Sequence, residues 1–208
     1  MDETALYDAR IELVDYAIDT FWDAPGESFV SNLLAGEVRT PGEAVSPDLD
    51  EGFAELERFV EENEGRDVET VRDELTTEYT RVFVGPRPPV LAHETYYRED
   101  EDFLGEGLAA VSASYAAAGW SPPEAYPEED DHLAVELAFV RHLVDRQRRG
   151  DEETFGYERV FLDEHLLRWI DAFAADVIEE TDEPFYRAGA KVVAGLVEFE
   201  DELVAQMA

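Results

Sequence analysis

The sequence has 208 residues, a formal net charge of −36 from 52 acidic and 16 basic residues, no cysteine, and 45% hydrophobic residues. The length and hydrophobic content predict one domain with one core, while the charge argues against binding to nucleic acids or anionic membranes. Without cysteine, disulfides, thiolate nucleophiles and cysteine metal sites are excluded, and no apolar run approaches the roughly eighteen residues of a membrane-spanning helix.

The acidic residues are spread along the whole chain, and Lys191 is the only lysine. Carboxylates retain water and cations at high salt, whereas a lysine stem exposes apolar surface, so this composition is typical of salt-in halophiles such as haloarchaea. A docking field for a basic partner is the alternative explanation, which the sequence does not separate from salt adaptation. The N-terminus, MDETALYDAR, lacks the basic and apolar regions of a signal peptide, so we expect a cytoplasmic protein.

Apolar residues recur at steps of three and four along most of the chain, which predicts amphipathic helices rather than strands. The predicted helices cover residues 4–22, 28–35, 49–60, 68–82, 104–118, 133–144, 161–177 and 184–208. Gly36, Gly119 and Gly150 follow three of them, as expected of residues that adopt the left-handed conformation past a helix end. We expect Asp67 to cap the helix that follows it, and Pro184 to be a first helical residue.

No alternating strand pattern of useful length occurs in the sequence. We therefore expect an all-α fold, residues 1–208 forming a single domain built as a bundle of about nine helices. The proline-rich, acidic segment WSPPEAYPEEDD predicts a hinge over residues 120–131. This hinge would join an N-terminal packed part, residues 1–119, to a C-terminal part, residues 132–208.

The first long break between predicted helices, GPRPPVLAHE, holds three prolines and cannot be helical or lie inside a sheet. Tyr79 and Phe83 precede it and fit the apolar stripe of the preceding helix, so a place in the core is the favoured interpretation for both. Glu94 has no such explanation. It is either solvated or offered to a cation such as arginine.

The second break ends in Asp130, Asp131 and His132, directly ahead of a predicted helix. Asp130 or Asp131 is a suitable N-cap, because an aspartate side chain accepts hydrogen bonds from the free backbone N–H groups. A protonated His132 would be opposed by the helix dipole, so we expect a neutral imidazole near pH 7. Helix capping and contact with a partner remain equal alternatives for the Asp–His pair.

Motifs of common enzymes are absent. The single lysine lies far from any glycine spacing typical of a P-loop, and neither a GxSxG elbow nor an HExxH zinc motif occurs. His132 and Glu136 share a helix face, but a metal site would need His93 or Glu94 to complete it. We therefore expect no enzyme, metal or cofactor, and keep a metal-dependent hydrolase using His132, Glu136 and Glu94 as an alternative.

Several ordered motifs resemble the TorD/DmsD family of redox-enzyme maturation chaperones. They are FVGP, ETYY, DDHLAVELAFVRHL, FLDEHLLRWIDAFAADV and PFYRAGAKVV, and the similarity runs from about Tyr79 to about Phe199. The resemblance implies an all-helical chaperone without turnover of its own. Such a chaperone binds the twin-arginine leader and the apo form of a molybdopterin enzyme, delays export until the cofactor is inserted, and in some members forms a homodimer.

Carried over position by position, the family's signal-peptide-binding residues fall on Phe83, Gly85, Pro86, Glu94, Tyr97, Asp131 and His132. The chain departs from the family pattern at Ala92 and His93, where proline and an aromatic residue are usual, and at Asp130, where proline is usual. We hypothesise that a groove between the two helical parts takes the apolar stretch of the leader, while Glu94 and Asp131 face its arginines. A general helical adaptor without leader specificity is the other alternative.

Overall fold

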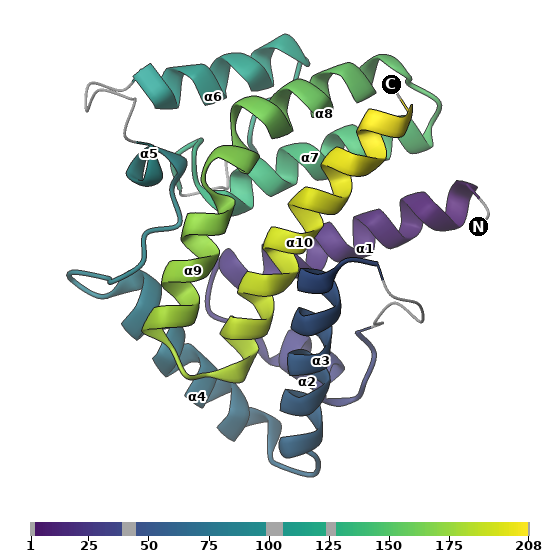
Figure 1. Cartoon of the computed structure of the whole chain (residues 1–208). Coiled ribbons are helices and arrows are strands. Elements are labelled where there is room, and N and C mark those ends of the chain that lie inside the picture. The colour runs from purple at the N-terminus through teal and green to yellow at the C-terminus, as the bar shows by residue number, and fades with distance from the viewer. Residues whose placement is uncertain (1–2, 39–44, 99–105, 124–127, 208) are drawn as a thin grey trace. The chain divides into compact units, whose positions relative to one another are not determined.

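The computed structural model describes residues 3–38, 45–98, 106–123 and 128–207 (Figure 1). Ten α-helices form in these residues, and the described backbone contains no strand beyond an isolated bridge between His93 and His132. The expected all-α bundle of about nine helices is therefore confirmed. Within the same ranges, no helix is both long and apolar enough to cross a bilayer. The expected helix start at Leu104 and hinge residues 124–127 lie outside the described residues.

The helices follow the predicted order closely. They are α1 (Glu3–Phe21), α2 (Glu27–Leu34), α3 (Pro47–Glu62), α4 (Val68–Tyr79), the single-turn α5 (Glu94–Tyr97), α6 (Glu106–Ala117), α7 (Leu133–Arg148), α8 (Glu153–Glu164), α9 (Ile170–Glu180) and α10 (Pro184–Met207). Asp67 caps α4 as predicted, because its side chain accepts a hydrogen bond from the Thr70 N–H at 3.1 Å. Gly36, Gly119 and Gly150 have positive φ, which confirms the three predicted helix ends.

Several boundaries differ from the prediction: α5 was not predicted, and α8 begins at Glu153 rather than at residue 161. A π-helical turn, η1 (Thr80–Val84), continues α4 up to Gly85. The apolar pattern over residues 161–177 predicted one helix, and this prediction is wrong. α8 ends at Glu164, a 3₁₀ turn η2 (Leu166–Arg168) follows, and α9 begins at Ile170.

Contacts within the chain divide it into two compact units of interleaved segments. The first unit holds Met1–Ile18, Ala92–Ile170 and Leu196–Ala208, and the second holds Asp19–Leu91 and Asp171–Gly195. Residues 128–131 of the expected hinge thus fall inside the first unit. The predicted division into parts 1–119 and 132–208 stays a prediction.

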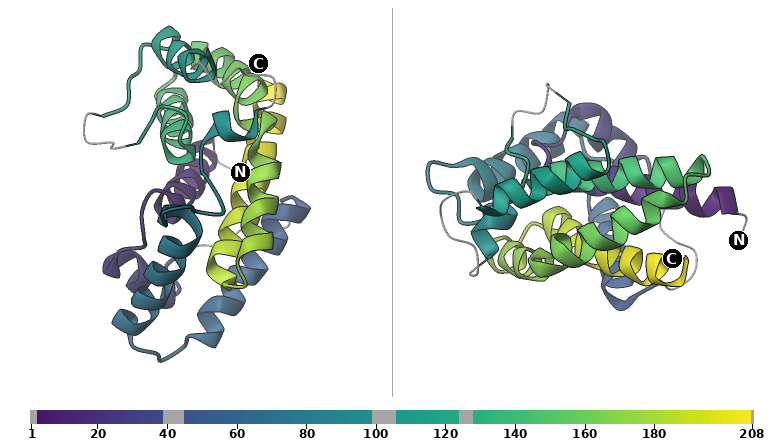
Figure 2. Two further views of the ribbon diagram at one scale, coloured as in Figure 1. Left: turned by 90° about the vertical axis from the view of Figure 1, so that its left-hand side faces the viewer. Right: turned by 90° about the horizontal axis from the view of Figure 1, so that it is seen from above.

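Aromatic rings and close helix packing form the core of the second unit. Phe83 lies within 5.1–6.5 Å of the rings of Phe21, Tyr79, Phe173 and Tyr186. On α10, a Cβ added at Gly195 would lie 2.7 Å from a backbone nitrogen of α3, so glycine allows the two backbones to approach. Both views of Figure 2 show α10 alongside α9 in this unit.

The first unit combines an aromatic core with a buried polar cluster. Tyr115, Phe139 and Phe161 bring α6, α7 and α8 together, with ring centroids 4.8 Å apart for each of the pairs that include Phe139. Figure 1 shows α7 and α8 side by side. A fully buried arginine of α1, Arg10, bonds to side chains of α7, α8 and α10.

Candidate functional site

The seven residues predicted to bind a signal peptide fall into two groups. Phe83, Gly85 and Pro86 belong to the second unit. Glu94, Tyr97, Asp131 and His132 belong to the first unit, where backbone pairing joins the segment that begins α5 to the segment before α7. The two groups are described separately.

The backbone of the loop before α5 pairs with the segment before α7. Glu94 donates its N–H to the Asp131 carbonyl at 3.0 Å, and Leu133 donates to the Ala92 carbonyl at 2.8 Å. These bonds flank the bridge between His93 and His132. The three prolines upstream disfavour helix, so the chain arrives extended and its polar backbone groups are available for this pairing.

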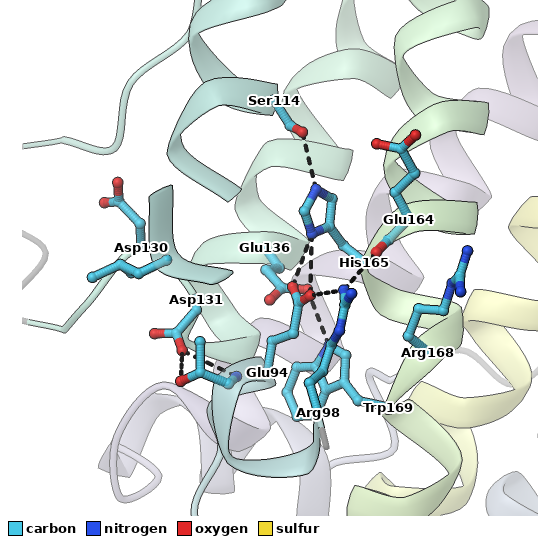
Figure 3. A network of polar contacts seen from close by, with 12 residues as sticks. Glu94, Arg98, Ser114, Asp130, Asp131, Glu136, Glu164, His165, Arg168 and Trp169 are labelled. Atoms are coloured by element: carbon cyan, nitrogen blue, oxygen red, sulfur yellow. Dashed lines mark hydrogen bonds and ion pairs between the residues drawn. The ribbon is translucent and has the colours of Figure 1, made fainter. Parts of the chain in front are cut away.

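Glu94 lies at the centre of a buried network (Figure 3). Its side chain is 0% exposed, and its Oε1 accepts a hydrogen bond from Arg98 Nη1 at 2.6 Å. Its Oε2 lies 3.0 Å from His165 Nδ1. The solvated interpretation of Glu94 is therefore wrong, because its side chain is enclosed and its cation is an arginine of the same chain, which directly follows α5.

Glu136 on α7 supplies a second carboxyl group to this network. Burial, and then the charge of Glu94, raise the pKa of Glu136 well above its usual value, which favours the protonated form of this carboxyl group. Its Oε1 accepts no hydrogen bond from the described residues, and a hydrogen bond between the side chains of Glu136 and Glu94 also raises the pKa of Glu136. Its Oε2 accepts from Trp169 Nε1 at 3.3 Å.

His165 extends the network to α6. Its Nε2 lies 2.9 Å from Ser114 Oγ, so serine, histidine and glutamate follow in the order of a hydrolase triad. Ser114 stands inside α6, however, where neighbouring N–H groups serve the helix and cannot stabilise an oxyanion. α8 ends just before His165, whose backbone dihedrals, φ −122° and ψ −91°, are not helical. The contacts of its side chain with Glu94 and Ser114 explain the break between α8 and α9.

Tyr97 packs against the network from α5. Its ring stacks on Trp169 with centroids 5.5 Å apart, and its neighbour Tyr96 meets it edge-on at 5.1 Å. Tyr96 is 57% exposed. An exposed aromatic ring is therefore held on a rigid base of two further rings.

Asp131 fastens the loop before α5. Its carboxylate accepts hydrogen bonds from His93 Nδ1 at 3.0 Å and from the Thr95 hydroxyl at 2.6 Å. Burial opposes the charged form of Asp131, but these hydrogen bonds outweigh it and lower its pKa. Burial also opposes the charged form of His93, but the hydrogen bond and charge of Asp131 outweigh it and raise the pKa of that imidazole.

The N-cap of α7 is His132, not an aspartate. His132 Nδ1 accepts a hydrogen bond from the Ala134 N–H at 3.2 Å, so the predicted capping by Asp130 or Asp131 is wrong. Asp130 instead accepts from the Ser112 hydroxyl, and Asp131 is held by the loop before α5. Burial, and then the neighbouring His93, lower the pKa of His132 to about 3, which confirms the expected neutral imidazole.

In the second unit, the FVGP motif ends the π-helical turn. The Gly85 N–H donates to the Thr80 carbonyl at 2.8 Å, and Phe83 belongs to the aromatic core described above. The core interpretation is therefore confirmed for Tyr79, which is buried, whereas Phe83 contacts the core rings but is only half-buried. Val84 points outward and is 61% exposed.

The alternative metal site does not have the geometry of a metal site. Its three residues would be His132, Glu136 and Glu94. Glu94 and Glu136 bond to each other and to the side chains described above. Among the described residues, the one group of three with metal-ligand geometry is His93, Glu128 and His132. Four residues of the network were not predicted from the sequence: Arg98, Ser114, His165 and Trp169. Only Arg98 had a local signal, its spacing of four residues from Glu94.

Comparisons with known proteins agree with these motifs. Residues 43–175 match the family described as nitrate reductase delta subunit. The chain is 23% identical to the chaperone protein TorD of Vibrio cholerae serotype O1 strain M66-2 over 97% of this chain and 96% of the relative. It is 24% identical to the chaperone protein TorD of Vibrio vulnificus strain YJ016 over 88% of this chain and 82% of the relative. The chain therefore belongs to the nitrate reductase delta subunit family of TorD-like redox-enzyme maturation chaperones, and it is not an enzyme.

Proposed function

We propose that the chain is a cytoplasmic chaperone for a molybdopterin oxidoreductase. It binds the twin-arginine signal peptide and the apo form of that enzyme, aids cofactor insertion and delays export. The chain belongs to a family of chaperones, and each of its FVGP and ETYY motifs exposes one large apolar side chain. This observation carries the proposal. These side chains are Val84, 61% exposed, and Tyr96, 57% exposed.

Apolar contacts are expected to supply most of the binding free energy. At the molar salt that the composition suggests, the Debye length is about 3 Å, so charges attract a leader only at contact distance. Burial of a valine and a tyrosine against the apolar stretch of a leader is insensitive to this screening. Tyr96 suits the task, because its ring is already held by Tyr97 and loses little freedom on binding.

The other motif residues then have a positioning role, each within its own unit. Glu94, Asp131 and His132 hold the loop before α5 and the start of α7 through the bonds given above. Phe83, Gly85 and Pro86 set the direction in which Val84 leaves the π-helical turn, and Tyr97 supports Tyr96. Leader arginines would meet exposed carboxylates of this strongly acidic chain, whose formal net charge is −36.

Fluorescence anisotropy with a labelled leader peptide tests the proposal, in molar KCl and with a second peptide in which both arginines are lysine. We expect Val84→Ala and Tyr96→Ala each to weaken binding about tenfold or more, as at other apolar contact residues. Val160→Ala is the matched control, because Val160 is 50% exposed but lies on α8. Equal affinities for all three variants would contradict the assigned surface.

The second peptide separates this function from that of a general adaptor. Lysine cannot reproduce the bidentate fork of arginine, so a leader-specific chaperone binds the lysine peptide more weakly. Equal binding of the two peptides, with Val84→Ala and Tyr96→Ala still impaired, would mean an adaptor that recognises apolar segments without leader specificity.

A further inference from the structure

Two histidines and a glutamate meet beside the Glu94 network, in the first unit. His93 precedes α5, His132 caps α7, and Glu128 lies four residues before His132. One ligand atom of each side chain lies within 4.8 Å of the others. The imidazole rings of the two histidines are 5.0 Å apart and nearly perpendicular, at 80°.

We propose that His93, His132 and Glu128 bind a divalent transition-metal ion. Two imidazole nitrogens and one carboxylate oxygen form a ligand set that Zn²⁺ uses, with a fourth position left for water. Harder cations such as Mg²⁺ prefer oxygen ligands and are poor candidates for this set. The proposal goes beyond chaperone function and does not rest on leader binding.

His93 is already oriented as a metal ligand. Its Nδ1 lies 3.0 Å from an Asp131 carboxylate oxygen, which can only accept, so Nδ1 carries the proton and Nε2 keeps its lone pair. Asp131 is itself held by the Thr95 hydroxyl at 2.6 Å. A carboxylate that fixes the tautomer and the ring direction of a ligating histidine is the usual outer-shell partner at metal sites.

His132 gives the proposed site a distinctive signature. Its Nδ1 accepts the Ala134 N–H, so the proton of the neutral ring is on Nε2. Coordination through Nε2 requires that proton to move to Nδ1, which then can no longer accept the Ala134 N–H, so the cap of α7 is weakened. A bond from one imidazole to the ion outweighs one helix cap, so binding remains favourable while the Ala134 amide loses its partner.

The three ligand atoms need to move only slightly closer together to bind an ion. Ligand atoms in a tetrahedral zinc site are about 3.3 Å apart, given bonds of about 2.0–2.1 Å. Glu128 is exposed, so it can approach the two imidazoles without disturbing the core. The bound ion would then fasten residues 128–132 to the loop before α5. His165 is not available, because both of its ring nitrogens already have partners in the network.

A titration of the full chain with Co²⁺ tests the site, because tetrahedral Co²⁺ gives intense visible absorption while an ion held by scattered carboxylates does not. Molar KCl suppresses such scattered binding. We expect one equivalent of Co²⁺ to bind, to be displaced by Zn²⁺ but not by Mg²⁺, and to increase hydrogen exchange of the Ala134 amide.

Three variants remove one ligand each and keep the surrounding bonds. In His93→Asn the amide still donates to Asp131, in His132→Asn the amide oxygen still caps α7, and Glu128→Gln alters only an exposed group. We expect each to weaken Co²⁺ binding about tenfold or more. The control His142→Asn, which changes a histidine outside the group, should bind normally. Absence of the tetrahedral absorption, or equal affinity in Glu128→Gln, His132→Asn and the control, would overturn the proposal.

Discussion

Replacing Arg10 by methionine is expected to remove a large part of the stability of the protein. The guanidinium is 0% exposed and bonds to Glu200 at 2.8 Å, Glu158 at 2.9 Å and Gln147 at 2.7 Å. Methionine fills most of the volume but leaves two buried carboxyl groups without their cation. Breaking a buried ion pair from one side costs about 3–5 kcal/mol, and whole domains have only about 5–15 kcal/mol.

The assay is urea unfolding followed by far-ultraviolet circular dichroism at pH 7 in constant salt. Arg148→Met is the matched control in the same unit, because Arg148 pairs with Asp8 at 2.7 Å but is 41% exposed. An exposed pair contributes about 0–1 kcal/mol, so the control should unfold almost as the parent does.

A second substitution separates lost charge from lost packing. If the unpaired carboxylate causes the loss, Glu200→Gln in the Arg10→Met background should restore part of the stability, because the amide needs no cation. A loss below about 1 kcal/mol in Arg10→Met would refute the reasoning, since it would be no larger than that of the surface pair. Failure of Glu200→Gln to restore stability would assign the loss to packing.

Three further predictions, which use five substitutions, are tested by urea unfolding. Burial and then Glu200 raise the pKa of Glu158 from 4.5 to about 8, so the folded state retains a proton that the unfolded state releases between these values. The contribution of this proton to the free energy of unfolding is complete below pH 4.5 and is lost as the pH rises through 8. The free energy of unfolding should therefore fall by at most about 1.4 kcal/mol per pH unit in this range, and Glu158→Gln should make that fall smaller. Gly195→Ala should cost about 1–3 kcal/mol, because its Cβ would lie 2.7 Å from a backbone nitrogen, whereas Gly156→Ala on α8 has open space and should stabilise by about 0.5–1 kcal/mol. Glu136→Gln should change stability by less than about 1 kcal/mol, whereas Glu94→Gln should cost about 1.5–3 kcal/mol, because only Glu94 pairs with Arg98. A larger loss in Glu136→Gln than in Glu94→Gln would contradict the raised pKa of Glu136.

Local chemistry made much of the fold predictable. The Asp67 cap, the glycines that end three helices and Pro184 at the start of α10 all act within a few residues of themselves, and each was found where expected. The all-α class follows from apolar periodicity, which is repeated along the chain and does not depend on any one boundary.

Long-range bonds explain what the sequence could not predict. His165 continues the apolar spacing of α8, and no glycine or proline marks the break after Glu164. The helix ends there because His165 bonds to Glu94, which is 71 residues away. The cap of α7 was assigned to the wrong residue for a similar reason. Asp131 is a good N-cap by type, but it is engaged by Thr95, 36 residues away, and His132 takes its place.

Three of the seven motif residues shared with the TorD/DmsD family are buried and thus poorly able to touch a partner in this chain. Glu94, Asp131 and His132 are at most 6% exposed, and each bonds to another part of the first unit. A motif of this kind specifies how a loop and a helix start are held together. The choice of partner must then come from exposed side chains that the same scaffold supports, such as Tyr96, and from positions where the chain departs from the family. His93 is such a departure, and its imidazole both secures Asp131 and faces His132. The resemblance thus explains the scaffold, and the departures indicate where chemistry particular to this chain should be sought.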